Sequence, residues 1–196
     1  MTALRLALLV LLAGCAGGPP PPDWQLNSVG ALQRFRQHYL NGDTRLADDE
    51  FALARTEIAR TGRGDLLARA ELVRCAVGVA SVVFDDCPGF EALRGEAGAE
   101  ELAYADYLAG RKERSGAASA DDPVSRLVST GAKLRQAKVT PAEVAVAVDI
   151  ASAQGWRRPL LAWLGVQAKL AEAAGDAEML RGIRRRIELT AGEPSK

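Results

Sequence analysis

Few side chains in this sequence are of a type and spacing that could do chemistry. His38 is the only histidine, and neither an HExxH nor a GxSxG motif is present. A metal site built on several histidines is therefore excluded. A single histidine between Gln37 and Tyr39 is typical of a surface or half-buried position on a helix. The sequence predicts no catalytic residue set and no metal centre.

Acidic residues gather in two short runs that could act as an acid pair or hold a cation. The first, Asp48-Asp49-Glu50, falls in the expected first turn of a helix, where the helix dipole favours carboxylates. The second, Asp85-Asp86, falls in a turn, where a lone acidic loop could bind Ca²⁺ weakly. Enzymes that cleave cell-wall glycan need one or two carboxylates in a cleft. The 25 acidic residues leave a cell-wall glycan- or peptide-acting enzyme as an alternative, although no surrounding motif favours it.

The first fifteen residues combine a basic residue, an apolar run and small residues before a cysteine. Arg5 precedes the apolar run 6–12, which is too short to cross a bilayer, since a spanning helix needs about 20 apolar residues. The segment resembles the signal peptide of bacterial lipoproteins, and Leu12-Ala13-Gly14-Cys15 resembles the lipobox. The resemblance implies that residues 1–14 are removed and that Cys15 is lipid-modified. This covalent lipid anchors the protein to a membrane, and no other cofactor is expected.

The residues after Cys15 indicate a destination and a tether. In lipoproteins of the enterobacterial kind, an aspartate after the modified cysteine retains the protein at the inner membrane. Here the residue is Ala16, which implies the periplasmic face of the outer membrane if the source has two membranes. Residues 15–23 contain two glycines and four prolines, so they are expected to form an extended tether.

The resemblance also bears on the two remaining cysteines. An exported protein folds in an oxidising compartment, and lipidation of Cys15 leaves Cys75 and Cys87 as a natural pair. We therefore expect a disulfide between them, with two separate thiols as the alternative. Their spacing is not that of a CxxC redox motif.

The rest of the sequence is patterned for helices. Apolar residues make up 48% of the chain and aromatic residues only 5%, so the core must come mainly from Ala, Leu and Val. Helical periodicity predicts an all-α fold of about eight helices, arranged as αα-hairpins in an irregular bundle or short solenoid. The first helix, 24–41, is expected to turn Val29 and Phe35 inward. Gly-Asp turns at 42–43 and 175–176 are similar to those of tetratricopeptide-type repeats, but no 34-residue register is sustained.

Local signals divide the chain further. Gly42, Gly155 and Gly175 are expected to end helices, Asp122-Pro123 to begin one, and Thr140 to begin another through a capping box with Glu143. Residues 24–191 form a single helical domain, and the polar loop 110–122 is a candidate boundary between halves 24–109 and 123–191. Residues 192–196 are expected to be a flexible tail.

The charges of the chain balance. With 25 basic and 25 acidic residues, there is no net charge to attract nucleic acid, which is not an expected partner.

Arginines and tryptophans near the C-terminus form a candidate surface for an envelope protein partner. Aromatic and Arg side chains mark interfaces, although a self-paired basic face and buried tryptophans are the alternatives. The candidate partner surface comprises Trp156, Arg157, Arg158, Trp163, Arg181, Arg184 and Arg185. The sequence thus favours a lipid-anchored periplasmic module that binds a protein or has a structural or accessory role. A cell-wall enzyme and a pilotin-like helper of secretion or pilus assembly are the alternatives.

Overall fold

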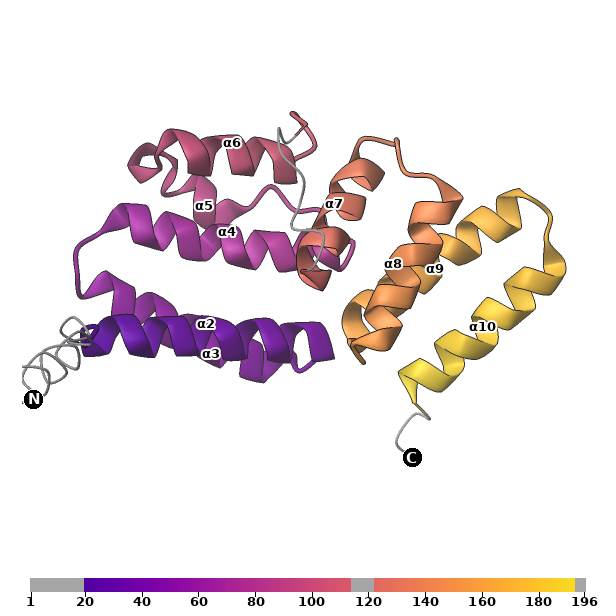
Figure 1. Cartoon of the computed structure of the whole chain (residues 1–196), viewed down its shortest axis with the longest axis horizontal. Helices are drawn as coiled ribbons and strands as arrows, with labels where there is room; N and C mark the ends of the chain where they lie inside the picture. The colour runs from indigo at the N-terminus through magenta and orange to yellow at the C-terminus, as the bar shows by residue number, and fades with distance from the viewer. Residues whose placement is uncertain (1–19, 114–121, 193–196) are drawn as a thin grey trace, which may run out of the picture.

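The structure is a computed structural model and describes residues 20–113 and 122–192. Within these residues the chain forms nine α-helices and one 3₁₀ helix, with no strand (Figure 1). The predicted all-α fold is therefore confirmed. The elements are α2 (Asp23–Asn41), α3 (Thr44–Ala59), α4 (Gly64–Ala80), α5 (Pro88–Glu91), η2 (Arg94–Glu96), α6 (Ala99–Leu108), α7 (Pro123–Arg135), α8 (Pro141–Ala153), α9 (Arg157–Ala173) and α10 (Ala177–Ala191).

Several predicted features fall outside the described residues. They are the signal peptide, Cys15, Ala16, most of the tether, the middle of the 110–122 loop and most of the C-terminal tail. Residues 20–22 of the tether precede α2 without regular secondary structure. None of the helices in the described ranges has the length and hydropathy that a membrane span requires.

Helices α2 and α3 form an antiparallel hairpin along one edge of the molecule (Figure 1). The turn between them is closed at Gly42, whose φ of 94° lies in the left-handed region that glycine adopts without strain. The rings of Phe35 and Phe51 pack between the helices with their centroids 5.0 Å apart. Ala47 is fully buried in the same core. Val29 differs from the prediction, because it is 50% exposed.

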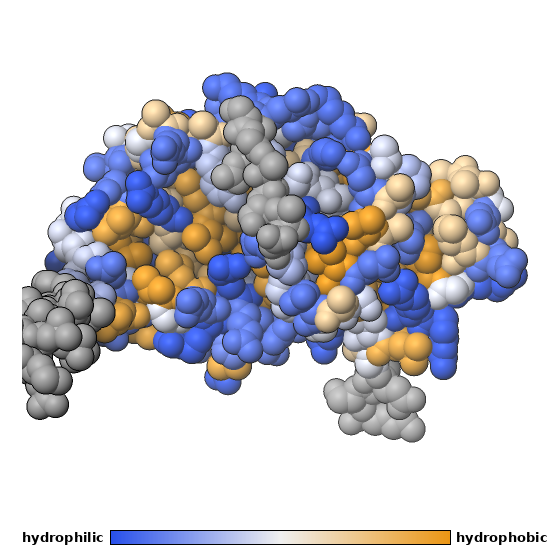
Figure 2. Space-filling model, in the orientation of Figure 1, coloured by the Kyte–Doolittle hydropathy of each residue, from blue (hydrophilic) through white to orange (hydrophobic). Residues whose placement is uncertain are grey.

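Helix α4 lies at the centre of the fold and packs against α2, α3, α5, α6 and α7. It is buried on more than one face, as expected of a helix that several neighbours cover. Helix α7 crosses it closely at Gly131, where a Cβ atom would collide with the carbonyl oxygen of Val79. The cover is incomplete, since Figure 2 shows apolar surface over α4 between α6 and α2.

A disulfide joins Cys75 of α4 to Cys87, as the sequence predicts. Their Cα atoms are 5.7 Å apart, a separation that a disulfide bridges without backbone movement. Arg135 of α7 contacts the segment between the two cysteines. It donates to the Asp85 carbonyl oxygen at 3.1 Å and to Asp86 Oδ1 at 3.2 Å. The short helix α5 follows. It was not predicted, because four residues are too few to show a helical repeat.

Helices α8, α9 and α10 form two consecutive hairpins at the C-terminal end (Figure 1). The predicted capping box begins α8: Thr140 Oγ1 accepts from the Glu143 amide at 3.3 Å, and Glu143 Oε2 accepts from the Thr140 amide at 2.9 Å. Gly155 and Gly175 end α8 and α9 with positive φ angles of 67° and 69°, also as predicted. Ile183 is the one buried residue of α10, which the structure describes completely.

The two predicted halves share a core. Buried residues on either side of the 110–122 loop belong to one hydrophobic cluster. Helix α7 packs on α4, and α9 packs on α2. The candidate boundary at this loop therefore separates helices that are held together by packing.

Candidate functional site

A groove of about 910 Å³ opens over α4. Its floor is α4, its walls are α6 and α7, and Arg36 of α2 stands at its edge. We call it the α4 groove. Its main apolar lining residues are Leu72, Val73, Val77, Tyr104, Val124 and Val128.

The floor of the α4 groove is apolar because α4 carries apolar residues on more of its circumference than its neighbours cover. Val73 remains half-buried at the floor, and Ala103 of α6 is exposed on the wall. Concave sites with apolar walls and a few polar groups are where proteins bind their ligands. The groove is therefore the best candidate for a binding site in the described residues.

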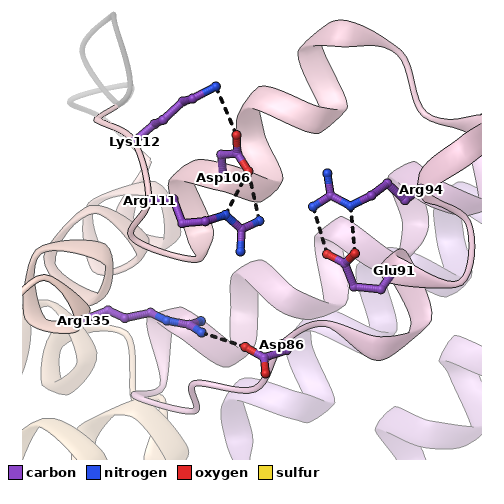
Figure 3. Close-up of polar contacts among 7 residues, drawn as sticks. All are labelled: Asp86, Glu91, Arg94, Asp106, Arg111, Lys112 and Arg135. Atoms are coloured by element: carbon purple, nitrogen blue, oxygen red, sulfur yellow. Dashed lines mark hydrogen bonds and ion pairs between the residues drawn. The ribbon is translucent and has the colours of Figure 1, made fainter.

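Most of the charged side chains around the α4 groove are paired. Arg69 Nε donates to Glu101 Oε1 at 2.6 Å, which links the floor to the α6 wall. Lys112 Nζ lies 3.1 Å from Asp106 Oδ2, and Arg111 holds the other oxygen of the same carboxylate (Figure 3). These exposed pairs contribute little stability, but they fix the position of charge on the rim.

Three charged side chains of the α4 groove, Arg36, Glu100 and Asp122, have no direct ion-pair partner within the part of the chain that the structure describes, but the charge on Arg36 interacts with the carboxylate of Asp122. Arg36 and Glu100 lie at opposite ends of the groove. Arg36 lies one turn before Tyr39, whose hydroxyl approaches Gly78 near the C-terminal end of α4. Glu100 is the neighbour of Glu101, which pairs near the N-terminal end of α4. The groove thus carries charge at both ends, and Asp122 partly balances the charge on Arg36.

The other carboxylates of the α4 groove are held in their ionised form. A hydrogen bond from its own backbone amide lowers the pKa of Glu101, and a hydrogen bond from Lys138 lowers the pKa of Glu113. Burial opposes ionisation of Asp122, but hydrogen bonds from the Ser125 hydroxyl and amide outweigh it and lower the pKa. A general acid needs the opposite, a raised pKa. These groups suit the binding of polar groups better than proton donation.

Two members of the predicted partner surface instead hold helices of this chain together. Trp163 is fully buried and its indole N–H donates to the Ala80 carbonyl oxygen at 2.9 Å, so its predicted place on an exposed surface is wrong. The last carbonyls of a helix lack partners within the helix, and Trp163 supplies one at the end of α4. Arg158 donates to the Tyr39 carbonyl oxygen at 2.6 Å and to Thr44 Oγ1 at 2.7 Å. We call this contact of α9 with α2, α3 and α4 the α9 seat.

The other five members of the predicted partner surface are exposed or half-buried. Arg184 lies 3.6 Å from Glu172, and Arg185 lies 3.5 Å from Glu188, so neighbouring acids neutralise part of this basic face. None of the five lines the α4 groove. They are Trp156, Arg157, Arg181, Arg184 and Arg185.

The remaining candidates from the sequence do not form a site. His38 is half-buried, with Nδ1 3.6 Å from Asp43 Oδ2. Across residues 20–113 and 122–192, the one close group of three potential metal-ligating side chains is Cys75, Asp85 and Cys87. Because the two sulfur atoms are joined to each other, this group is a disulfide beside an exposed acid.

No family model matches the chain, and no curated protein or solved structure is significantly similar to it. Sequence reasoning also missed the α4 groove. The signal that could have found it is the apolar excess of α4, where Leu66, Val73 and Val77 accompany the buried residues Leu72, Ala76 and Val79. A helix that is apolar on several faces needs more cover than one hairpin partner can give.

Proposed function

We propose that this chain is a membrane-anchored helical lipoprotein of the bacterial cell envelope whose domain binds a protein partner in the α4 groove. The observation that carries the proposal is the groove itself, with its apolar floor and charged rim. The predicted lipobox and tether supply the location at the periplasmic face of the outer membrane. In this role the protein is an accessory or structural module that holds its partner near the membrane.

Binding fits the α4 groove better than catalysis does. The ionised state of Glu101, Glu113 and Asp122 removes the most obvious proton donors. The single histidine lies on α2 and does not line the groove. The apolar floor and charged rim match the usual pattern of a protein-binding groove, in which apolar contacts supply affinity and rim charges supply selectivity.

The proposal is tested by photocrosslinking in cells. A photoreactive residue replaces Ala103 on the groove wall, and a matched control replaces Ala173, which is exposed on α9 away from the groove. We expect a specific adduct with an envelope protein from position 103 and none from position 173. Val73→Glu should abolish this adduct, because it places a charge on the apolar floor.

Two further measurements make this experiment decisive. Thermal unfolding must show that Val73→Glu remains folded, and Val73→Ala, which adds no charge, should retain most of the adduct. Identical adducts from positions 103 and 173, or an adduct that survives Val73→Glu in a folded protein, would refute binding in the α4 groove.

The predicted anchor is tested separately with Cys15→Ser. Without the thiol the chain cannot be acylated, so the protein should leave the membrane fraction on a carbonate wash. The folded domain should keep its unfolding midpoint, since position 15 precedes the described helices. Continued membrane association of Cys15→Ser would contradict the lipoprotein assignment.

A further inference from the structure

We infer that α10 packs against α10 of a second copy of this chain, so that the protein forms a dimer with two-fold symmetry. The inference goes beyond the proposed function, because none of the residues of α10 lines the α4 groove. Three observations carry it. They are a glycine in the middle of α10, exposed apolar side chains beside this glycine, and two charges that are complementary to those of a second copy.

Gly182 lies in the middle of α10, where the packing of this chain does not require a glycine. A glycine inside a helix is less favourable than an alanine. Gly131 of α7 shows what such a glycine can do, since its lack of a side chain lets α7 approach the Val79 carbonyl oxygen closely. At Gly182, no described atom of another part of the chain lies within 4 Å of the place of a Cβ atom. The close approach that a glycine permits is therefore open to a helix of another molecule.

Two apolar side chains near Gly182 are exposed. Met179 precedes Gly182 by three positions and Leu189 follows it by seven, so both lie close to Gly182 on the helix surface. Met179 is 51% exposed and Leu189 is 65% exposed, because α10 packs mainly on α9 and buries a different side, that of Ile183. A helix packed at Gly182 would cover both side chains, and the burial of their apolar surface would favour association.

Two charges on α10 are complementary to those of a second copy. Glu178 lies four positions before Gly182 and Arg186 four positions after it, so the three residues form one ridge along the helix. Neither charged side chain has an ion-pair partner within residues 20–113 and 122–192, and Glu178 forms no ion pair with Arg181, three positions further on. Both charges are exposed, so both are available to a second molecule.

The two charges favour the antiparallel arrangement. In a parallel pair of α10 helices, like charges would face each other at both ends of the ridge. In an antiparallel pair that crosses at Gly182, Glu178 of each copy faces Arg186 of the other, about 6 Å from the crossing point at 1.5 Å per residue. Ridges with this spacing of four interdigitate in the commonest class of helix packing. Because such a two-fold interface is closed, the expected assembly is a dimer.

The neighbouring arginines of α10 do not prevent this pairing. Arg184 lies 3.6 Å from Glu172, and Arg185 lies 3.5 Å from Glu188, so nearby acids balance their charges. The helix also lies at the opposite end of the long axis from the start of α2 (Figure 1), so the pairing uses neither the predicted tether nor the α4 groove. Exposed ion pairs are weak, but anchoring in one membrane would raise the local concentration of copies.

Charge reversal tests the pairing in the full-length chain, purified in detergent micelles and followed by sedimentation equilibrium. We expect the wild-type chain to dimerise reversibly. Arg186→Glu and Glu178→Arg should each weaken the dimer about tenfold, since two attractions become two repulsions. An equimolar mixture of the two variants should dimerise again, because both facing pairs then have opposite charges. Arg126→Glu, at an exposed arginine of α7, is the matched control and should leave the dimer unchanged.

Gly182→Leu tests the crossing point and guards against a folding defect. Leucine is a better helix former than glycine, and its Cβ atom would have open space around it, so the unfolding temperature should rise. The same side chain should keep the two helices apart and abolish the dimer.

Four outcomes would overturn the inference. They are a wild-type chain that stays monomeric up to about 1 mM, an open-ended assembly, charge-reversal variants that dimerise as the wild type does, and a dimer that Gly182→Leu leaves unchanged. The crosslink expected from position 103 does not depend on α10, so it would stand in all four cases.

Discussion

The α9 seat and the α4 groove both lie against α4, but one is closed and the other is open. In the α9 seat, Trp163 and Arg158 fill the contact, and each of them donates to a backbone carbonyl of another helix. In the α4 groove, the described residues leave a concave surface over the floor, and the charge on Arg36 interacts with the carboxylate of Asp122. The same residue types thus serve folding where their groups are satisfied internally. Side chains that line a concave surface instead, such as Val73, are accessible to the partner that we propose.

The largest expected effect is the loss of Trp163, which tests whether the α9 seat is structural. Trp163→Ala removes a fully buried ring and leaves the Ala80 carbonyl oxygen without its donor. The free energy of unfolding should fall by about 4 kcal/mol. Urea denaturation followed by circular dichroism measures the loss. Trp156→Ala is the matched control, and it should cost clearly less because Trp156 is only half-buried. Equal losses would remove the distinction between the two tryptophans.

The next largest effect is expected from the disulfide, which joins Cys75 of α4 to the segment before α5. The bond spans a sequence separation of 12, and a loop of this size contributes about 3 kcal/mol, mainly by restricting the unfolded chain. The double variant Cys75→Ala/Cys87→Ala should lose about that amount of unfolding free energy in urea. Thiol titration of the denatured, unreduced wild-type domain should find neither sulfur free. Two free thiols would show that the pair is reduced in the native protein.

Two arginines provide the most direct test of the comparison. Arg158→Ala breaks two hydrogen bonds and a stacking contact in which the guanidinium carbon lies 4.2 Å from the Tyr39 ring centroid. It should cost about 2 kcal/mol of unfolding free energy. Arg36→Ala should change stability by less than about 0.5 kcal/mol, but it should reduce the crosslink from position 103. If Arg36→Ala lowers the free energy of unfolding as much as Arg158→Ala does, then Arg36 at the groove edge is as important for stability as Arg158. The comparison between the groove and the α9 seat would then fail.

Local features of this fold could be predicted from the sequence, and tertiary features could not. The capping box at Thr140 and the turn at Gly42 depend on residues within a few positions of each other, so their residue types suffice. The disulfide was predicted from compartment and cysteine count. Val29 sits on the expected helix, yet half of it is exposed, because the side that α3 covers is set by packing of Phe35 and Ala31. Helical periodicity shows which residues share a face of a helix, but it does not determine which of two similarly apolar faces is buried.

The α4 groove was missed for the same reason. Its residues come from four helices and from the two ends of the 110–122 loop, and no local pattern joins them. Trp163 and Arg158 were assigned to a surface because their type is common at interfaces. Trp and Arg side chains are common at interfaces because they make apolar contacts and also donate hydrogen bonds. In this chain, α2, α3 and α4 provide the contacts and the acceptors for Trp163 and Arg158. A residue type alone therefore cannot distinguish an interface within the chain from one with a partner.

A small gain in stability is expected at the end of α7, which forms a wall of the groove and also leads to α8. Ala137 ends this helix with a φ of 55°, and the bonds Lys138 N to Lys133 O and Ala137 N to Leu134 O, both 2.9 Å, form the same helix-ending motif that Gly42 closes. An alanine in the left-handed region is strained where glycine is not. Ala137→Gly should therefore raise the free energy of unfolding by about 0.5–1 kcal/mol.

Ala137→Gly also separates stability from binding. Ala137 is exposed, so the substitution removes no buried contact and should leave the crosslink from position 103 unchanged while the urea midpoint rises. Val82→Gly is the matched control: Val82 has a φ of 59° but is half-buried in the core, and the loss of its packing should offset the relief of strain. A fall in stability for Ala137→Gly would mean that this turn is not strained. A changed crosslink would mean that the end of α7 affects the groove wall. Stability and binding in the α4 groove would then not be independent.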